Sequence, residues 1–273
     1  MTRSILITGC SSGIGHDAAH ELHKQGWTVV ASARKAEDVA RLRDEGLLAV
    51  RIDYEDPDSI ASGFEAALEH TGGTLDALFN NGAYAIPGPL EDIPSEALSA
   101  IFQANLIGWH DLTRRAISVM RPVGRGRIIN CSSVLGIVGG RWRGAYVATK
   151  FALEGMTDVL RMEMDGTGIE VVLIQPGPIT TRFRQNAIRQ FERWVDWESS
   201  PRADDYRASL LDQLYQGSSG PSWPASAVTA KLIRALEARN PRARYRVTPH
   251  TSVAEAMRRL LPAKIVDRIM RRS

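Results

Sequence analysis

The chain has 273 residues, of which 44% are hydrophobic and 24% charged, as in an ordinary globular protein with a large core. The formal net charge of +3 is small for this length and argues against a dedicated nucleic-acid binder. Two cysteines without a Cys-x-x-Cys pair exclude a disulfide framework and a zinc ribbon and suit a reducing compartment, so we expect a cytoplasmic protein. No metal site is expected, no secretory leader is visible, and no apolar run approaches the ~20 residues that span a bilayer.

Short apolar runs alternate with helical patterns along the whole chain. The predicted strands cover residues 4–8, 27–33, 47–53, 75–80, 127–132, 168–175 and, at the end, 244–248. The predicted helices lie near residues 17–25, 36–45, 57–70, 95–120 and 145–165. Such alternation predicts an α/β fold, a doubly wound parallel sheet with helices on both faces. No linker or repeat divides the sequence, so residues 1–273 are expected to form one domain.

Three glycines directly follow the first predicted strand, in the segment Thr8-Gly-Cys-Ser-Ser-Gly-Ile-Gly15. Glycines allow the backbone to turn sharply and approach a pyrophosphate, while the helix N-terminus supplies N–H donors and a positive dipole end. The spacing has one more residue between the first two glycines than the common G-x-G-x-x-G pattern. A glycine-rich turn without a ligand is the alternative.

Tyr146 and Lys150 are four residues apart in a predicted helix and therefore share a face. A phenol normally titrates near ~10. A neighbouring cation favours the phenolate, which lowers the pKa of the phenol. The pair is therefore a candidate proton donor or acceptor for interconversion of a carbonyl and an alcohol.

The order of these motifs resembles the short-chain dehydrogenase/reductases, closely over residues 3–181 and loosely beyond. The residues that carry the resemblance are Thr8 to Gly15, Asp53, Asn80-Asn81-Gly82-Ala83, Asn105, Ser133, Tyr146, Lys150, Pro176-Gly177 and Thr181. Lys150 to Gly155 and Pro176 to Pro178 resemble the branch with retinol and hydroxysteroid dehydrogenases and aldehyde reductases. The resemblance implies a Rossmann-type fold and an oxidoreductase.

Four residues form the expected catalytic set. Tyr146 would exchange the proton with the substrate oxygen, and Ser133 would donate a hydrogen bond to that oxygen. The resemblance implies that Lys150 also binds the nicotinamide ribose and that Asn105 holds a water linked to Lys150. The alternatives are a strand-end hydroxyl that satisfies the backbone for Ser133, and a local backbone bond or small kink for Asn105.

The expected cofactor is NADP(H). Ala33 stands at the end of the second strand where NAD enzymes usually carry an acid, and Arg34 and Lys35 follow it, which suits a 2′-phosphate. A solvated basic pair is the alternative. The resemblance places Asp53 near the adenine, unless it simply caps a turn. It also implies the cofactor contacts Gly9, Ser11, Ser12, Gly13, Ile14, Gly15, Asn81, Gly82, Tyr146, Lys150, Pro176, Gly177, Ile179 and Thr181.

One departure from the family pattern concerns the order of two small residues. Gly82 precedes Ala83, where the family usually has Ala before Gly. The conformation of this turn is in question because Ala tolerates positive φ poorly.

Residues 182–223 hold seven of the aromatic side chains and are expected to form a helical lid over the substrate. Two amphipathic helices that pack on the core are the other interpretation. Residues 250–273 are expected to be a C-terminal helical extension, basic and amphipathic, either packed or frayed rather than bound to a membrane surface.

These observations predict an NADP(H)-dependent oxidoreductase that acts on a lipophilic aldehyde, ketone or secondary alcohol. The alternatives are a 3-oxoacyl thioester reductase and, from another class, an NADP(H)-binding regulatory protein without turnover. The family commonly pairs through the helices near 95–120 and 145–165, so the resemblance also implies a homodimer or homotetramer.

Overall fold

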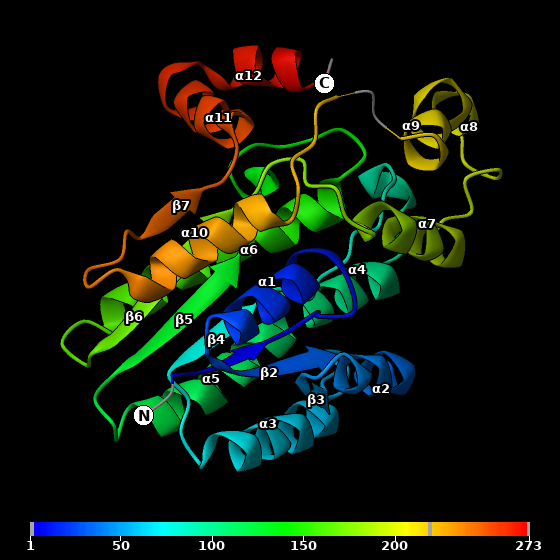
Figure 1. Cartoon of the computed structure of the whole chain (residues 1–273). Coiled ribbons are helices and arrows are strands. Elements are labelled where there is room, and N and C mark those ends of the chain that lie inside the picture. Colours follow the sequence, from blue (N-terminus) through cyan, green and yellow to red (C-terminus); the bar gives the residue numbers. More distant parts are fainter. Residues whose placement is uncertain (1–2, 218–219, 272–273) are drawn as a thin grey trace.

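The computed structural model describes residues 3–217 and 220–271, and its centre is a seven-stranded parallel sheet (Figure 1). The strand order is β3-β2-β1-β4-β5-β6-β7. The strands are β1 Ser4–Ile7, β2 Thr28–Ala33, β3 Leu48–Arg51, β4 Ala77–Asn80, β5 Gly126–Cys131, β6 Ile169–Gln175 and β7 Arg244–Arg246. The predicted α/β fold and all seven predicted strands are confirmed, with ends that shift by one or two residues.

Helices cover both faces of this sheet (Figure 1). The first seven are α1 Gly13–Lys24, α2 Ala36–Asp44, α3 Pro57–Thr71, α4 Ser95–Phe102, α5 Gly108–Met120, α6 Gly144–Glu163 and α7 Phe183–Trp194. The others are α8 Ala203–Asp205, α9 Leu211–Tyr215, α10 Ser226–Glu237, α11 Pro249–Leu260 and α12 Ala263–Met270. α1 packs beside α10 on one face, and α3 packs beside α5 on the other, where α6 also lies.

Apolar residues make the strands the centre of the core. Ile5, Leu6 and Ile7 of β1 are fully buried, and Ile5 pairs with Val29 of β2 on one side and with Ala77 of β4 on the other. Strands buried on both faces read as continuous apolar runs, which is why they could be predicted. The chain changes direction across the sheet between β1 and β4, the point at which open parallel sheets bind ligands.

Two helical regions differ from the expectation. The helix predicted over 95–120 is divided into α4 and α5 by a π-helical turn, Gln103–Ile107. α10 was not predicted, although it packs on α1 with Val228, Leu232 and Ala235 fully buried.

The C-terminal region forms two helices, α11 and α12, that lie over the loop after β5 (Figure 1). Ala254 packs with Ile137 and Val138 of that loop, and Val266 of α12 joins the same cluster. Residues 272–273 of the predicted extension lie outside the described residues. Among the residues described, no helix combines the length and the apolar character needed to cross a membrane.

Candidate active site

The glycine loop between β1 and α1 packs so closely that two of its positions have no room for a side chain. Gly9 and Gly13 have φ values of +69° and +63°, in the left-handed region that glycine favours. A Cβ on Gly9 would lie 2.5 Å from the Cα of Gly82, and one on Gly13 would lie 2.8 Å from Cγ2 of Thr181. The loop therefore contacts the segments that follow β4 and β6.

The start of α1 has the properties of an anion site. Ser12 precedes the helix in an extended conformation, and its side chain makes no capping hydrogen bond to the first turn. Gly15 could not carry a Cβ, which would lie 2.5 Å from the carbonyl oxygen of the first loop glycine. Ile14 packs on the core beneath the loop, and the carbonyl of Ser11 accepts a hydrogen bond from Arg41. Free N–H groups of a first helical turn and a cradle of glycines fit the pyrophosphate of a dinucleotide.

The segment after β4 is tied to the same loop. The backbone N–H of Asn81 donates to Oγ1 of Thr8 at 2.9 Å, and Nδ2 of Asn81 donates to the Thr8 carbonyl at 3.0 Å. Neither Gly82 nor Ala83 has a positive φ, so the exchanged order of these residues imposes no strained backbone. The turn therefore keeps an ordinary backbone conformation with Gly82 before Ala83.

The basic pair after β2 lies at the surface. The guanidinium of Arg34 is 3.8 Å from the carboxylate of Glu55 and about half exposed, and Lys35 pairs with Glu37 at 3.3 Å. Both side chains can reach an added phosphate without leaving a buried partner. Oδ1 of Asp53 accepts a hydrogen bond from the N–H of Glu55 at 3.1 Å, so this carboxylate stabilises a turn in the loop after β3.

Ser133, Tyr146 and Lys150 come together where β5 ends and α6 begins. Tyr146 and Lys150 lie in the first two turns of α6 and are 8% and 1% exposed. Ser133 follows β5, and its Oγ accepts a hydrogen bond from the N–H of Leu135 at 3.1 Å. The side chain of Ser133 also lies close enough to the Tyr146 hydroxyl to lower its pKa, which places the two side chains together.

Burial controls the electrostatics of this group. Burial raises the pKa of Tyr146, and the hydrogen bond with Ser133 opposes that rise. Nζ of Lys150 donates to the Cys131 carbonyl at 2.8 Å and lies 4.4 Å from the ring centroid of Trp109 but 5.6 Å from that of Tyr146. Burial lowers the pKa of Lys150 to about 8. The net pKa of Tyr146 is therefore raised rather than lowered in this arrangement, because desolvation outweighs the other influences on the phenol.

Trp109 was not identified from the sequence, yet it joins two parts of the site. Its indole N–H donates to the carbonyl of Gly82 at 2.9 Å, and its ring faces the ammonium of Lys150. A cation over a tryptophan ring is attracted by the quadrupole of the ring. No sequence signal marked this residue, because its partners are 27 and 41 positions away.

Asn105 lies in the π-helical turn between α4 and α5 and is fully buried. Its Oδ1 accepts from the N–H of Tyr84 at 3.1 Å, and its Nδ2 donates to the Tyr84 carbonyl at 2.8 Å. Nδ2 also lies 3.3 Å from Oγ1 of Thr149 in α6. The side chain thus fixes the segment after β4 against α6, through backbone bonds to a residue 21 positions away in the sequence.

The other predicted cofactor contacts follow β6 and are Pro176, Gly177, Ile179 and Thr181. The Pro176 carbonyl accepts from the N–H of Val134 at 2.7 Å, which joins this segment to the loop after β5. Ile179 forms a bridge with Trp223. Thr181 contacts the glycine loop and accepts a hydrogen bond from the N–H of Phe183 at the start of α7.

A second apolar cluster includes Tyr146 and packs around it. It joins α4 and the segment after β4 with α7, α9 and the π-helical turn Tyr206–Leu210. Its buried members include Ile86, Ile101, Ala145, Tyr146, Phe191, Val195, Tyr206, Leu210 and Leu214. The ring of Phe183 meets that of Tyr146 edge-on, with the centroids 5.4 Å apart. Among the aromatic side chains of residues 182–223, Phe191 and Tyr206 are buried in this cluster, while Phe183, Trp194 and Trp197 pack against it partly buried. Residues 218–219 lie outside the described part.

Trp142 connects α6 to this cluster in a conformation that is rare for its residue type. Its φ is +64°, and among the described residues other than glycine it alone has a positive φ. Its carbonyl accepts from the N–H of Gly88 at 2.9 Å, its indole N–H donates to Ser209 at 3.3 Å, and its ring stacks with Tyr206. Such backbone strain costs on the order of 1–3 kcal/mol and persists only where the surroundings enforce it.

Comparison with known proteins agrees with this geometry. Residues 3–192 match the family model described as short chain dehydrogenase. The chain is 39% identical over 270 residues to the uncharacterized oxidoreductase YbbO of Escherichia coli K12, covering 99% of this chain and 94% of that protein. It is 30% identical to the NADPH-dependent 3-dehydrocapnine reductase of Ornithobacterium rhinotracheale (98% and 95% covered) and to the rat 17-beta-hydroxysteroid dehydrogenase type 6 (96% and 86% covered).

The fold has solved counterparts. A short chain dehydrogenase/reductase from Burkholderia phymatum, crystallised in complex with NAD, superposes with a TM-score of 0.80 at 23% identity, over 99% of this chain and 95% of that one. At this identity the likeness concerns the fold alone. The family match, the parallel sheet and the glycine loop together identify the chain as a member of the short-chain dehydrogenase family, and therefore as an oxidoreductase with a nucleotide-binding fold.

Proposed function

We propose that this protein transfers a hydride between NADP(H) and a lipophilic aldehyde, ketone or secondary alcohol, with Tyr146 as the general acid and base. The observation that carries the proposal is the meeting of Ser133, Tyr146 and Lys150 at the end of β5. These residues lie at the same sheet edge as the glycine loop. A hydroxyl pair next to a buried amine is suited to proton transfer at a substrate oxygen.

The cofactor proposed is NADP(H) rather than NAD(H). The glycine cradle and the first turn of α1 would hold the pyrophosphate, and Arg34 with Lys35 would hold the 2′-phosphate. The NADPH-dependent 3-dehydrocapnine reductase among the relatives supports this choice. The bound cofactor would supply or accept the hydride.

Residues of this chain would transfer the proton to or from the substrate oxygen. The Tyr146 hydroxyl would give its proton to the carbonyl oxygen in reduction, and Ser133 would donate a hydrogen bond to the same oxygen. The phenolate that forms is then stabilised by the ammonium of Lys150, which the Cys131 carbonyl and Trp109 hold in place. Burial excludes water from Tyr146, so its proton passes to the substrate rather than to solvent.

A lipophilic substrate suits the apolar cluster that covers Tyr146. The side chains of α7 and α9 that pack around Tyr146, with Phe183 among them, are apolar. The related 17-beta-hydroxysteroid dehydrogenase type 6 supports a substrate of this class. Because Tyr146 is only 8% exposed, α7 to α9 would have to move as a lid to admit the substrate.

The outer surface of α5 and α6 is the proposed pairing surface of a homodimer or homotetramer. Four apolar side chains there are exposed: Ile107, Met156, Val159 and Met162. Leu106, Met156 and Val159 also line a groove of about 340 Å³ between these helices. Exposed apolar patches of this kind mark interaction surfaces.

The substitution Tyr146→Phe tests the proposed chemistry. It removes one hydroxyl and little volume, so turnover should fall by ~100- to 10,000-fold while NADPH binding is kept. Oxidation of NADPH with a panel of aldehydes and ketones, followed by absorbance, measures the first quantity, and calorimetric titration measures the second. Tyr215→Phe, at an exposed position of α9, is the matched control and should leave both unchanged. A Tyr146→Phe protein with more than about a tenth of the wild-type turnover would refute the role.

A further inference from the structure

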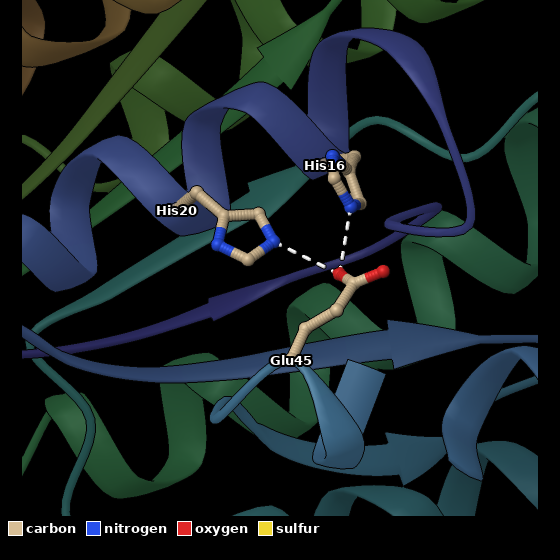
Figure 2. A group of neighbouring side chains, drawn as sticks. All are labelled: His16, His20 and Glu45. Carbon is tan, nitrogen blue, oxygen red and sulfur yellow. Dashed lines mark hydrogen bonds and ion pairs between the residues drawn. The ribbon is translucent and has the colours of Figure 1, made fainter. Parts of the chain in front are cut away.

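Two histidines and a glutamate meet between α1 and the end of α2 (Figure 2). His16 and His20 are four residues apart in α1 and lie on one face of it, and Glu45 caps the C-terminus of α2. Nε2 of His16 lies 2.8 Å and Nε2 of His20 lies 2.9 Å from the same oxygen, Oε2 of Glu45. One carboxylate oxygen thus receives both imidazoles.

The other carboxylate oxygen of Glu45 is bound by Arg41. Nη1 of Arg41 donates to Oε1 of Glu45 at 2.7 Å, and Nη2 of Arg41 donates to the Ser11 carbonyl in the glycine loop, also at 2.7 Å.

Imidazole nitrogens and one carboxylate form a ligand set for a divalent transition metal. Imidazole suits zinc, copper, nickel and cobalt, whereas magnesium and calcium prefer oxygen ligands. Two histidines at positions i and i+4 of a helix bind zinc from one face, as in the H-E-x-x-H motif. The three ligand atoms lie within 4.8 Å of one another. Zinc bonds to such atoms are about 2.0–2.2 Å long, so small rotations of these partly exposed side chains would admit an ion.

The hydrogen bond from Arg41 matches what metal sites require of their surroundings. A ligating carboxylate is usually fixed by a hydrogen bond to its second oxygen, and here Arg41 supplies it. Arg41 in turn is held by Asp38 at 3.1 Å, so the positive charge near the site is compensated. The carboxylate is thus already oriented toward the two imidazoles.

We propose that His16, His20 and Glu45 bind one divalent transition-metal ion of the zinc, cobalt or nickel type, with water as the remaining ligand. The ion would join α1 to the end of α2 beside the cofactor loop, and it takes no part in the proton transfer at Tyr146. No metal site was expected from the sequence. Glu45 lies 25 residues after His20 and meets the two histidines only in the fold.

Calorimetric titration of the full chain, free of any affinity tag and treated with a chelator, tests this proposal. The titrants are Zn²⁺, Co²⁺ and Mg²⁺, and we expect one high-affinity Zn²⁺ or Co²⁺ per chain and no matching Mg²⁺ binding. His16→Ala, His20→Ala and Glu45→Gln should each weaken Zn²⁺ binding by at least about 10- to 100-fold. His23→Ala, which removes an exposed histidine of the same helix, should bind as the wild type does.

Visible absorption of the Co²⁺ form gives a second readout, because it reports nitrogen and oxygen coordination directly. Its bands should appear in the wild type and in the His23→Ala protein and should be lost in His16→Ala and His20→Ala. Absence of stoichiometric Zn²⁺ binding, or equal binding by wild type and the three site variants, would overturn the proposal. The result is independent of the proposed function, since Tyr146→Phe should keep the metal site whatever its turnover.

Discussion

The glycine loop and the helices α7 to α9 are held in place by opposite means. In the glycine loop, the proposed nucleotide side, the closest contacts are between backbones. A Cβ on Gly9, for example, would collide with the Cα of Gly82. In α7 to α9, the proposed substrate side, the contacts are between large side chains, among them Phe191, Tyr206 and Trp142. The first region leaves almost no choice of residue, while the second depends on how particular rings pack.

The two regions differ because they are expected to bind different chemical groups. A pyrophosphate is recognised by backbone N–H groups, so the loop needs a fixed path and small residues. A substrate is recognised by the shape and polarity of side chains, which can change without altering the sheet below them. We therefore expect substitutions on the nucleotide side to act through the backbone or through charge, and those on the substrate side to act through packing.

The largest expected effect is the replacement Phe191→Ala in α7. Phe191 is 1% exposed and lies within the second cluster, so its removal leaves a cavity. Replacing a buried phenylalanine with alanine typically costs about 3–5 kcal/mol of unfolding free energy. Denaturant unfolding of the wild type and the variant measures this. A loss below about 1 kcal/mol would mean that α7 is only loosely docked and that the substrate side is not packed as core.

The sequence predicted the sheet well because each buried strand carries its own signal. Runs such as Ile5 to Ile7 are apolar whatever surrounds them, and the motif residues lie at the ends of those runs. The candidate site residues lie near the ends of such elements, since Ser133 comes two residues after β5 and Tyr146 lies in the first turn of α6. Features that depend on residues close together in the sequence could therefore be predicted from the sequence.

Features that depend on distant partners were not predictable. The π-helical turn around Asn105 becomes understandable only with Tyr84 and Thr149 in contact. The position of the Lys150 ammonium, on the Cys131 carbonyl and Trp109 rather than on Tyr146, requires three elements to be assembled. Spacing along a helix established that two side chains share a face but not which partner each prefers.

The next effect concerns the pH dependence of stability. Burial lowers the pKa of Lys150 from its ordinary value of 10.5 to about 8, so between these pH values the unfolded chain binds more protons than the folded one. The stability of the wild type should therefore rise with pH across this window, relative to Lys150→Met, by up to about 3 kcal/mol. Denaturant unfolding at several pH values between 7 and 11 measures the difference.

The control for this measurement is Lys24→Met, at an exposed position at the end of α1. Its stability should differ from that of the wild type by the same amount at every pH. Parallel curves for wild type and Lys150→Met would contradict the depressed pKa of Lys150. They would also show that the ammonium has access to water, which the close packing around α6 argues against.

A smaller effect is expected on the nucleotide side, where charge rather than packing decides. Arg34→Ala should weaken NADPH binding by roughly 1–3 kcal/mol, the range for a lost hydrogen bond to a charged group, and leave NADH nearly unchanged. The wild type should bind NADPH at least about tenfold more tightly than NADH. Calorimetric titration with both cofactors measures each affinity. Equal losses for the two cofactors would show that Arg34 supports the fold of the loop and does not contact a phosphate.

The smallest effect is expected at Phe183, which occupies the same helix as Phe191, eight residues earlier. Its ring is only partly buried and meets Tyr146 edge-on at 5.4 Å, so Phe183→Ala should cost far less stability than Phe191→Ala. An aromatic pair of this kind is worth about 0.5–1.5 kcal/mol beyond its buried area. If Phe183 lines the substrate path, Phe183→Ala should change the ratio of the KM values for carbonyl compounds of different bulk. The change should be equivalent to about 0.5–1.5 kcal/mol, while the affinity for NADPH stays constant. Steady-state kinetics on linear and polycyclic ketones measure this, and identical KM ratios in wild type and variant would restrict Phe183 to a packing role.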